Sequence, residues 1–349
     1  MSAYAIYRLP HANYCTKIEQ TQGEPEELLS CIELNGKEGF VLAPFEIKEQ
    51  QPILLIRPDR VERLPLDSAT DTADISCIPS SPNHPSVEYS IDFANFHAQL
   101  EAGAFRKVVL ARCAQEQSDE AIPPMELFFH ACNLYPRLFI SLVYTSRSGF
   151  WLTATPEILL EGKGTSWRTI ALAGTMQLKG EQLNGEGETV SWTTKNIQEQ
   201  HYVTTYITEC LEQFTSDFRE EGPYTVRAAN LVHLRSDFTF TLPDTQHIGE
   251  LLQALHPTPA VCGLPKRDAF RFIISNEHTP RRYYSGFMGP LLCADTHLYV
   301  SLRCMNIDNN HYFLYAGGGL LKESLVEMEW NETEAKLETM RKCIVASKM

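Results

Sequence analysis

The chain of 349 residues has no long hydrophobic run. A helix needs about 18 consecutive apolar residues before it is read as a membrane span, and no stretch of that kind occurs. The opening segment MSAYAIYRLPHANYCTKIEQ also lacks the basic start and the apolar core of a secretory signal. These absences predict a cytoplasmic protein without a membrane anchor.

An excess of positive charge is also missing. Lys and Arg number 30 against 44 Asp and Glu, so the formal net charge is −14. A surface that binds nucleic acid needs clustered basic residues, so we expect no nucleic-acid partner. An acidic protein can still bind a small anion where Arg, Lys, backbone N–H groups or a metal ion gather locally.

Paired cysteines of the C-x-x-C type are absent, although the chain has ten cysteines. Scattered cysteines in a chain without a secretory signal are expected to be reduced thiols that pack in the core. A zinc site is therefore not predicted.

Many strand patterns are present, and they often follow one another directly. Helical patterns lie between blocks of strands rather than after every strand, as in the helical segment 195–214. This order favours an α+β fold with large antiparallel or mixed sheets over a doubly wound α/β fold. We expect one large domain, in which residues 1–85 form a strand-rich N-terminal part and residues 86–349 the core. The polar, proline-containing segment 67–85 is the predicted loop.

The most informative segment is HYFLYAGGGLLKESLVEMEWNETEAK, residues 311–336. A strand pattern ends in Gly317, Gly318 and Gly319, and a helical pattern then places Glu329, Glu332 and Lys336 on one face. Glycines allow close approach of the backbone to an anion, and two nearby carboxylates suggest a hard cation such as Mg²⁺. The alternative is a flexible turn before a solvated helix.

Three further charged residues have two interpretations each. Lys107 opens the strand pattern KVVLAR and is either a lysine that reaches solvent or a desolvated general base. Glu157, after Pro156, is either a surface residue or a general acid with a raised pKa. Glu199, in the helix that starts at Lys195, is either solvated or a third carboxylate for a metal ion.

Polar residues in other strand patterns could hold a small anion. Arg303 lies inside the predicted strand LYVSLRCMNI and could bind a carboxylate through two hydrogen bonds. Tyr284 could add a hydroxyl group to the same carboxylate. Thr175 follows Gly174 where the predicted strand WRTIALAGT ends in a glycine turn, and its hydroxyl could contact a polar ligand.

Taken together and in this order, ten segments resemble those of the chorismate-utilising enzymes. That family contains isochorismate synthase, salicylate synthase, anthranilate synthase component I and aminodeoxychorismate synthase. The resemblance covers roughly residues 90–345 and implies that residues 86–349 are a chorismate-binding catalytic core. It also implies two packed, mostly antiparallel sheets surrounded by helices. The matching segments are KVVLAR, ATPEILL, LAGT, KNIQEQ, VHL, LHPTPAVCGLP, YYSGFMG, SLRC, AGGG and EMEWNETEAKL.

The resemblance implies a role for each charged residue. Members of the family that add water at C2 of chorismate carry lysine where this chain has Lys107, whereas amine-adding members typically carry glutamine. Lys107 would activate the water, and Glu157 would protonate the departing C4 hydroxyl group. Glu199, Glu329 and Glu332 would hold Mg²⁺ on the ring carboxylate.

The remaining implied roles concern the substrate. The enolpyruvyl carboxylate would be held by Tyr284, Arg303, Gly317, Gly318, Gly319 and Lys336, and the ring site would be lined by Thr175 and His233. One departure concerns the metal helix, where the family usually has Glu-His and this chain has Glu199-Gln200. A slip of one residue would place Gln200 at the metal position and weaken Mg²⁺ binding.

The resemblance therefore implies a Mg²⁺-dependent isochorismate synthase with chorismate as its small-molecule substrate. The product would serve menaquinone or siderophore synthesis, and menaquinone is preferred because no feature of secondary metabolism occurs. A monomer is expected. The rivals are a salicylate synthase, an amine-adding synthase with a glutaminase partner, and an inactive homologue that only binds chorismate or a protein.

Overall fold

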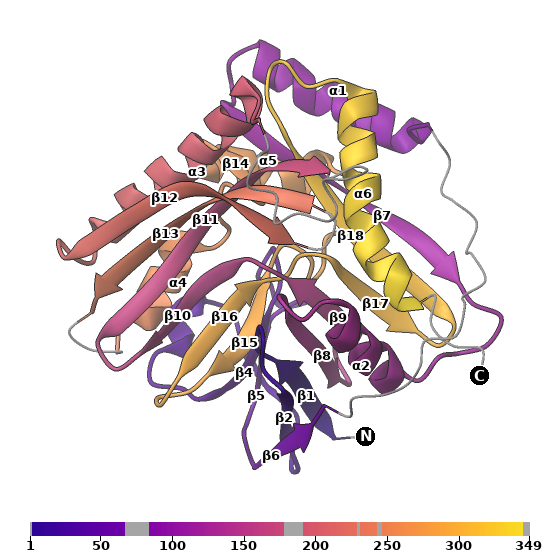
Figure 1. Ribbon diagram of the computed structural model, residues 1–349, viewed down its shortest axis with the longest axis vertical. Helices are drawn as coiled ribbons and strands as arrows, with labels where there is room; N and C mark the ends of the chain where they lie inside the picture. The colour runs from indigo at the N-terminus through magenta and orange to yellow at the C-terminus, as the bar shows by residue number, and fades with distance from the viewer. Residues whose placement is uncertain (1, 67–83, 178–190, 229–230, 243–245, 345–349) are drawn as a thin grey trace.

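Two nine-stranded sheets form the framework of the protein (Figure 1). The structure is a computed structural model that describes residues 2–66, 84–177, 191–228, 231–242 and 246–344. The predicted loop 67–85 falls almost entirely outside the described residues. All strand pairs within the two sheets run antiparallel, which confirms the predicted sheet type.

Each sheet contains strands from both ends of the chain. Sheet A has the order β14 (Gly263–Leu264), β7 (Lys107–Gln117), β18 (His311–Leu320), β17 (Cys304–Asp308), β9 (Gly149–Thr155), β8 (Phe139–Thr145), β1 (Ala3–Arg8), β2 (Tyr14–Gln20), β6 (Arg60–Pro65). Sheet B has the order β12 (Phe218–Ala228), β13 (Leu231–Thr241), β11 (Ser166–Gln177), β10 (Ile158–Lys163), β16 (Thr296–Val300), β15 (Phe287–Leu291), β4 (Gly39–Ala43), β5 (Ile53–Ile56), β3 (Glu26–Leu28).

Apolar side chains from the two sheets meet in a shared core. Phe139 and Trp151 of sheet A are buried together with Phe40, Met288 and Tyr299 of sheet B. The Phe139 and Tyr299 rings stack with centroids 4.2 Å apart, which joins the two sheets directly. The predicted arrangement of two packed sheets is therefore confirmed.

The helices cover the outer faces of the sheets, as predicted. They are α1 (Val87–Glu101), α2 (Pro124–Leu134), α3 (Thr194–Leu211), α4 (Ile248–Leu255), α5 (Lys266–Asn276) and α6 (Val326–Ile344), with one 3₁₀ turn at Cys31–Leu34. Helices α3 and α4 share a buried apolar cluster with sheet B, and α2 and α6 share another with sheet A. Helix α5 was not predicted from the sequence.

Two predictions about where strands end are wrong. The segment LYVSLRCMNI is not one strand, because β16 ends at Val300 in sheet B and β17 begins at Cys304 in sheet A. The strand expected to end in a turn at Gly174 continues to Gln177, since Gly174 forms a bulge with a φ of +66°. Both places lie beside the site described below.

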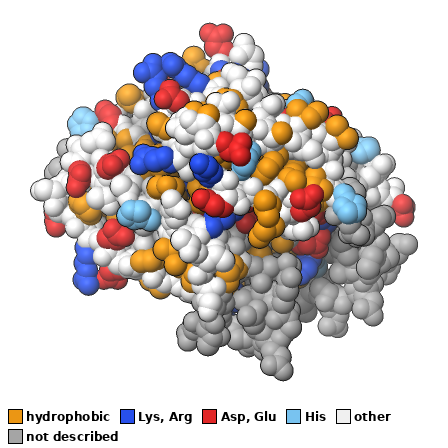
Figure 2. All heavy atoms as spheres, turned by 90° about the horizontal axis from the view of Figure 1, so that it is seen from above, with side chains coloured by type: hydrophobic (Ala, Val, Ile, Leu, Met, Phe, Trp, Pro, Cys, Tyr) orange, Lys and Arg blue, Asp and Glu red, His pale blue; other side chains and the backbone are white. Residues whose placement is uncertain are grey.

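The molecular surface is mixed in charge. On the face that Figure 2 shows, acidic and basic side chains are dispersed among apolar ones, so this face offers no broad basic patch. Among the described helices, none has both the length and the apolar character to cross a membrane.

Candidate active site

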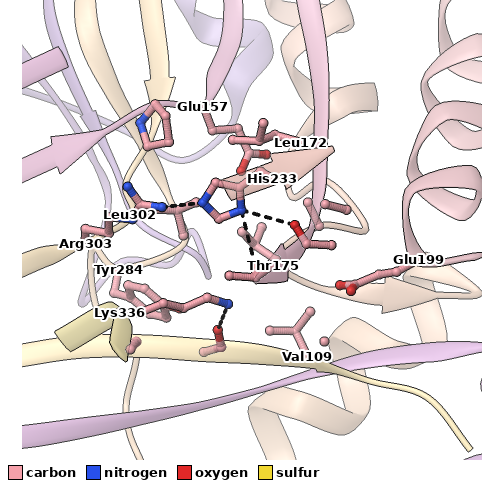
Figure 3. A pocket seen from close by; sticks show the side chains of 18 of the residues that line it. Val109, Glu157, Leu172, Thr175, Glu199, His233, Tyr284, Leu302, Arg303 and Lys336 are labelled. Carbon is pink, nitrogen blue, oxygen red and sulfur yellow. Dashed lines mark hydrogen bonds between the residues drawn. The ribbon is translucent and has the colours of Figure 1, made fainter. Parts of the chain in front are cut away.

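One pocket gathers residues from both sheets and from two helices (Figure 3). It lies where the chain passes from β16 to β17, beside the glycine end of β18. The wall contains most of the predicted site residues, namely Glu157, Thr175, Glu199, His233, Tyr284, Arg303, Gly317, Gly319 and Lys336. Four predicted site residues are not part of this wall. Lys107 and Glu332 pair with the wall residues Glu199 and Lys336, Gly318 lies between two wall glycines, and Glu329 lies next to Gly318.

The glycine run is an open strand edge, so the alternative of a flexible turn is wrong. Strand β18 pairs with β7 as far as Leu320, whereas its pairing with β17 ends at Tyr315. In β7, Ala111 lies opposite Gly317 and Val109 lies opposite Gly319. Their N–H groups do not donate to β18, because Val109 N donates to Cys262 O and Ala111 N donates to Glu277 Oε1. The polar backbone groups of Gly317 and Gly319 therefore point away from β7, toward the pocket.

Each glycine leaves room for a functional group. A Cβ atom would lie 2.7 Å from the Tyr284 hydroxyl at Gly317, 3.0 Å from Glu329 Oε2 at Gly318, and 2.1 Å from Glu199 Oε1 at Gly319. These distances are shorter than van der Waals contact. A Cβ atom at Gly317 or Gly319 would therefore force the Tyr284 hydroxyl group or the Glu199 carboxylate to move, whereas one at Gly318 would need only a small shift of Glu329.

The change Gly319→Ala should therefore disable the site while leaving the fold intact. The added methyl group would displace the Glu199 carboxylate and press on Lys107 Cε, which would lie 2.9 Å away. We expect turnover to fall by about 100-fold, the cost of misplacing catalytic groups by roughly 1 Å. Gly164→Ala is the control for a glycine change away from the pocket. A Cβ atom there meets nothing within 4 Å, and the φ of +58° means that the change costs stability without touching the site. Near-normal turnover in Gly319→Ala would contradict this account.

Lys107 is completely buried, so the alternative of a lysine that reaches solvent is wrong. Its Nζ atom lies 3.0 Å from Glu199 Oε1, so the two groups form an ion pair. Burial raises the pKa of Glu199, but the ammonium groups of Lys107 and Lys195 outweigh burial, and the net shift is downward. Glu199 thus remains an anion.

The structure also places Gln200. Its side chain accepts a hydrogen bond from Ala173 N (2.8 Å) and donates to Ala171 O (3.1 Å), so it binds the backbone of β11 beside the Gly174 bulge. Glu199 faces the glycine strand instead. Glu199, and not Gln200, therefore lies beside the carboxylates of α6.

Glu157 is buried between β9 and β10 and is 2% exposed, which rules out the surface alternative. Burial raises its pKa to about 8, although Lys107 and Arg303 favour the charged form. A carboxyl group with this pKa is mostly protonated at neutral pH and can donate a proton.

His233 and Arg303 form a buried pair at the crossing between the sheets (Figure 3). A guanidinium group only donates, so His233 Nε2 accepts from Arg303 and the ring proton is on Nδ1, 3.2 Å from Gly174 O. Burial and the charge of Arg303 hold the pKa of His233 well below its usual range. The His233 ring is therefore a neutral part of the pocket wall, beside Thr175 Oγ1 at 3.3 Å.

Arg303 differs from its predicted setting, because it lies in the link between β16 and β17 and not in a strand. Its backbone has a φ of +47°, which is uncommon for residues other than glycine and is tolerated mainly at functional places. The buried Nη1 group has no hydrogen-bond partner among the described residues. An unpaired guanidinium N–H in a pocket favours binding of an anionic ligand.

Lys336 and Tyr284 approach the same open edge. Lys336 Nζ donates to Gly317 O at 2.8 Å and to Glu332 Oε1 at 2.7 Å. Burial raises the pKa of the Tyr284 hydroxyl group, so it stays a neutral donor. With Arg303, these groups provide two cations and a hydroxyl group for a carboxylate.

Helix α6 brings Glu329 and Glu332 to the glycine strand, as its spacing predicted. Glu329 is 1% exposed, and its Oε2 atom has no partner among the described residues. Burial, and then the charge of Glu332, raise the pKa of Glu329. An unpaired buried carboxylate oxygen suits a cation with oxygen ligands. Within the described ranges, however, no group of three His, Cys, Asp or Glu side chains is arranged to hold a metal ion.

The sequence interpretation missed Lys195, which it used only to mark the start of a helix. In the structure the Lys195 ammonium group pairs with Glu329, 134 residues away. The available signal was its place in the same matching segment as Glu199, one helical turn before that residue.

Comparison with known proteins finds similarity over most of the chain. A family model described as "Chorismate binding enzyme" matches residues 56–345. An isochorismate synthase of Bacillus subtilis is 31% identical over 257 residues, which cover 70% of this chain and 64% of that protein. The aligned segment thus spans slightly less than two thirds of the length of this relative.

Two solved structures have the same fold. A Bacillus anthracis protein described as a 2,3-dihydroxybenzoate-specific isochorismate synthase aligns with a TM-score of 0.81 and 23% identity, over 98% of this chain and 96% of that one. The menaquinone-specific isochorismate synthase of Escherichia coli also has a TM-score of 0.81, with 21% identity over 99% of this chain and 89% of that one. At these identities the likeness concerns the fold.

Proposed function

The chain belongs to the chorismate binding enzyme family, and on this premise we propose that it is an isochorismate synthase that converts chorismate to isochorismate. The observation that carries the proposal is a buried carboxyl group, Glu157, with a pKa raised to about 8, in one pocket with two cationic side chains, Arg303 and Lys336. The named relatives support the same reaction.

The proposed reaction adds one water molecule and releases another. Lys107 acts in its neutral amine form and takes a proton from the water as the water oxygen forms a bond to C2 of the ring. The ring double bonds shift, the bond between C4 and its hydroxyl group breaks, and Glu157 gives its proton to the departing oxygen. One proton is accepted and one donated, so no oxidant or reductant is needed.

The other residues hold the two carboxylates of chorismate. Arg303, Lys336, Tyr284 and the backbone of Gly317–Gly319 bind the enolpyruvyl carboxylate, while Thr175 and His233 line the ring. Glu199, Glu329 and Glu332 supply the oxygen donors that Mg²⁺ prefers, and among the described residues Glu329 Oε2 lacks a partner. The three carboxylates adjoin Gly318 and Gly319, but each is paired with a lysine, so they would have to turn toward one another to hold the ion. When bound, Mg²⁺ supplies positive charge for the ring carboxylate.

A product assay tests the proposal. The purified protein is incubated with chorismate, with and without Mg²⁺, and the products are separated with mass and fluorescence detection. Isochorismate that forms only with Mg²⁺ and without pyruvate is expected. Salicylate with pyruvate would identify a salicylate synthase instead, and no turnover would indicate an inactive homologue or a missing partner. The onward use of the product in menaquinone or siderophore synthesis is tested separately by gene deletion.

The reaction should slow in alkaline solution. Because the pKa of Glu157 is about 8 and the acid works in its protonated form, the protonated fraction of Glu157 falls about tenfold for each pH unit above that value. Once Lys107 is in its neutral form, kcat/KM should fall with this fraction. A pH profile of kcat/KM between pH 6 and 10 measures this limb in the unaltered protein and in Glu157→Gln. An alkaline limb that persists unchanged in Glu157→Gln would contradict the assignment of Glu157.

A further inference from the structure

Three carboxylates at the glycine strand are each matched by a lysine. Glu199 Oε1 lies 3.0 Å from Lys107 Nζ, and Glu332 Oε1 lies 2.7 Å from Lys336 Nζ. Glu329 forms an ion pair with Lys195. These six residues come from β7, α3 and α6. With every group ionised, the three negative and three positive charges balance without a bound ion.

Lys195 differs from the other two lysines. Lys107 is fully enclosed, and Lys336 is also held by Gly317 O, whereas the Lys195 side chain is 25% exposed at the start of α3. The Lys195 ammonium group pairs with Glu329 and also interacts electrostatically with Glu199 and Glu332. It therefore lies within the field of all three carboxylates.

The Lys195 ammonium group occupies the place beside the Glu329 carboxylate that a bound metal cation would need. Lys195 contacts Oε1 of Glu329, and the Oε2 atom of the same carboxylate is buried and has no partner in the part of the chain that the structure describes. A cation that took both oxygens would have to replace the ammonium group, since two positive charges on one carboxylate repel each other. The partly exposed lysine can leave toward solvent on its flexible stem.

We propose that Lys195 is an internal counter-ion that occupies the carboxylate site of Glu329 and competes with Mg²⁺ for it. This inference rests on the proposed function for the identity of the cation. A divalent cation adds two positive charges to a site whose charges already balance, and the two negative charges of a dicarboxylate substrate neutralise them. Lys195 thereby makes cation binding weak in the free protein and couples it to the binding of the dianion.

Calorimetry with Mg²⁺ alone, in the absence of chorismate, tests the competition. Lys195→Met should bind Mg²⁺ at least about 10-fold more tightly than the unaltered protein, since the competing charge is gone. Lys195→Arg should remain weak. Lys37→Met is the matched control, because Lys37 pairs with Glu26 on the exposed surface. Unchanged or weaker Mg²⁺ binding by Lys195→Met would overturn the proposal.

Thermal unfolding provides a second measurement. In EDTA, Lys195→Met should have a lower Tm than the unaltered protein, because the buried Glu329 carboxylate loses its partner. Added Mg²⁺ should raise the Tm of the variant by more than it raises that of the unaltered protein, and an equal or smaller rise would count against competition. If tighter Mg²⁺ binding occurred without isochorismate formation, the function would fail and the inference would stand. If isochorismate formed but Lys195→Met did not bind Mg²⁺ more tightly, the inference would fail and the proposed function would stand.

Discussion

Lys107→Ala should abolish turnover of chorismate while the substrate still binds. The variant loses the group that is proposed to take a proton from the attacking water, and positioned proton transfer contributes about 10²- to 10⁴-fold to a rate. The carboxylate-binding residues Arg303 and Lys336 remain, so we expect the Kd for chorismate to change little. Rapid-quench turnover and equilibrium binding measure the two quantities separately.

Arg106→Ala is the control for Lys107→Ala. Arg106 immediately precedes Lys107, but its side chain is exposed and packs over the ring of Tyr202. Its removal should leave turnover within about threefold, as expected for a surface change. Full activity of Lys107→Ala would remove the base assignment, and loss of chorismate binding would make Lys107 a binding residue instead.

Glu157→Gln should stop the departure of the C4 hydroxyl group without changing Mg²⁺ binding. Glutamine keeps the size of the side chain but has no acidic proton, so we expect kcat to fall by about 10²- to 10⁴-fold. The residual activity should also lose the alkaline limb near pH 8, because the group that titrates there is gone. Single-turnover kinetics and Mg²⁺ calorimetry provide the readouts.

Glu161→Gln serves as the control for Glu157→Gln. Glu161 lies in β10, whereas Glu157 directly precedes that strand, and Glu161 pairs with Arg168 and His297 away from the pocket. This change should affect stability and leave kcat near normal. A loss of Mg²⁺ affinity in Glu157→Gln would mean that Glu157 belongs to the cation site rather than to the acid role.

Local sequence patterns predicted much of the site. The spacing of Glu329, Glu332 and Lys336 follows helical geometry, which depends on neighbouring residues alone, and α6 has the predicted form. The ordered motifs identified the family, which the family model confirms over residues 56–345. The roles of the individual residues stay predictions until the variants are measured.

Other features could not be read from local patterns. A run of ten residues that contains Arg303 is a good strand pattern, yet two sheets share it, because sheet membership depends on distant partners. The unusual φ of Arg303 follows from that crossing. The sequence also left open whether Lys107 and Glu157 are buried, since exposure is a property of the packed molecule.

Composition and periodicity act over a few residues, so they were enough to predict the fold class, the lack of a membrane-spanning segment and the helix that carries two carboxylates. Which charges meet depends on the packed molecule. Arg303 and His233 are 70 residues apart, and Lys195 and Glu329 are 134 apart. Such pairs form only when strand order and register bring their elements together, and burial then makes each charge depend on its partner.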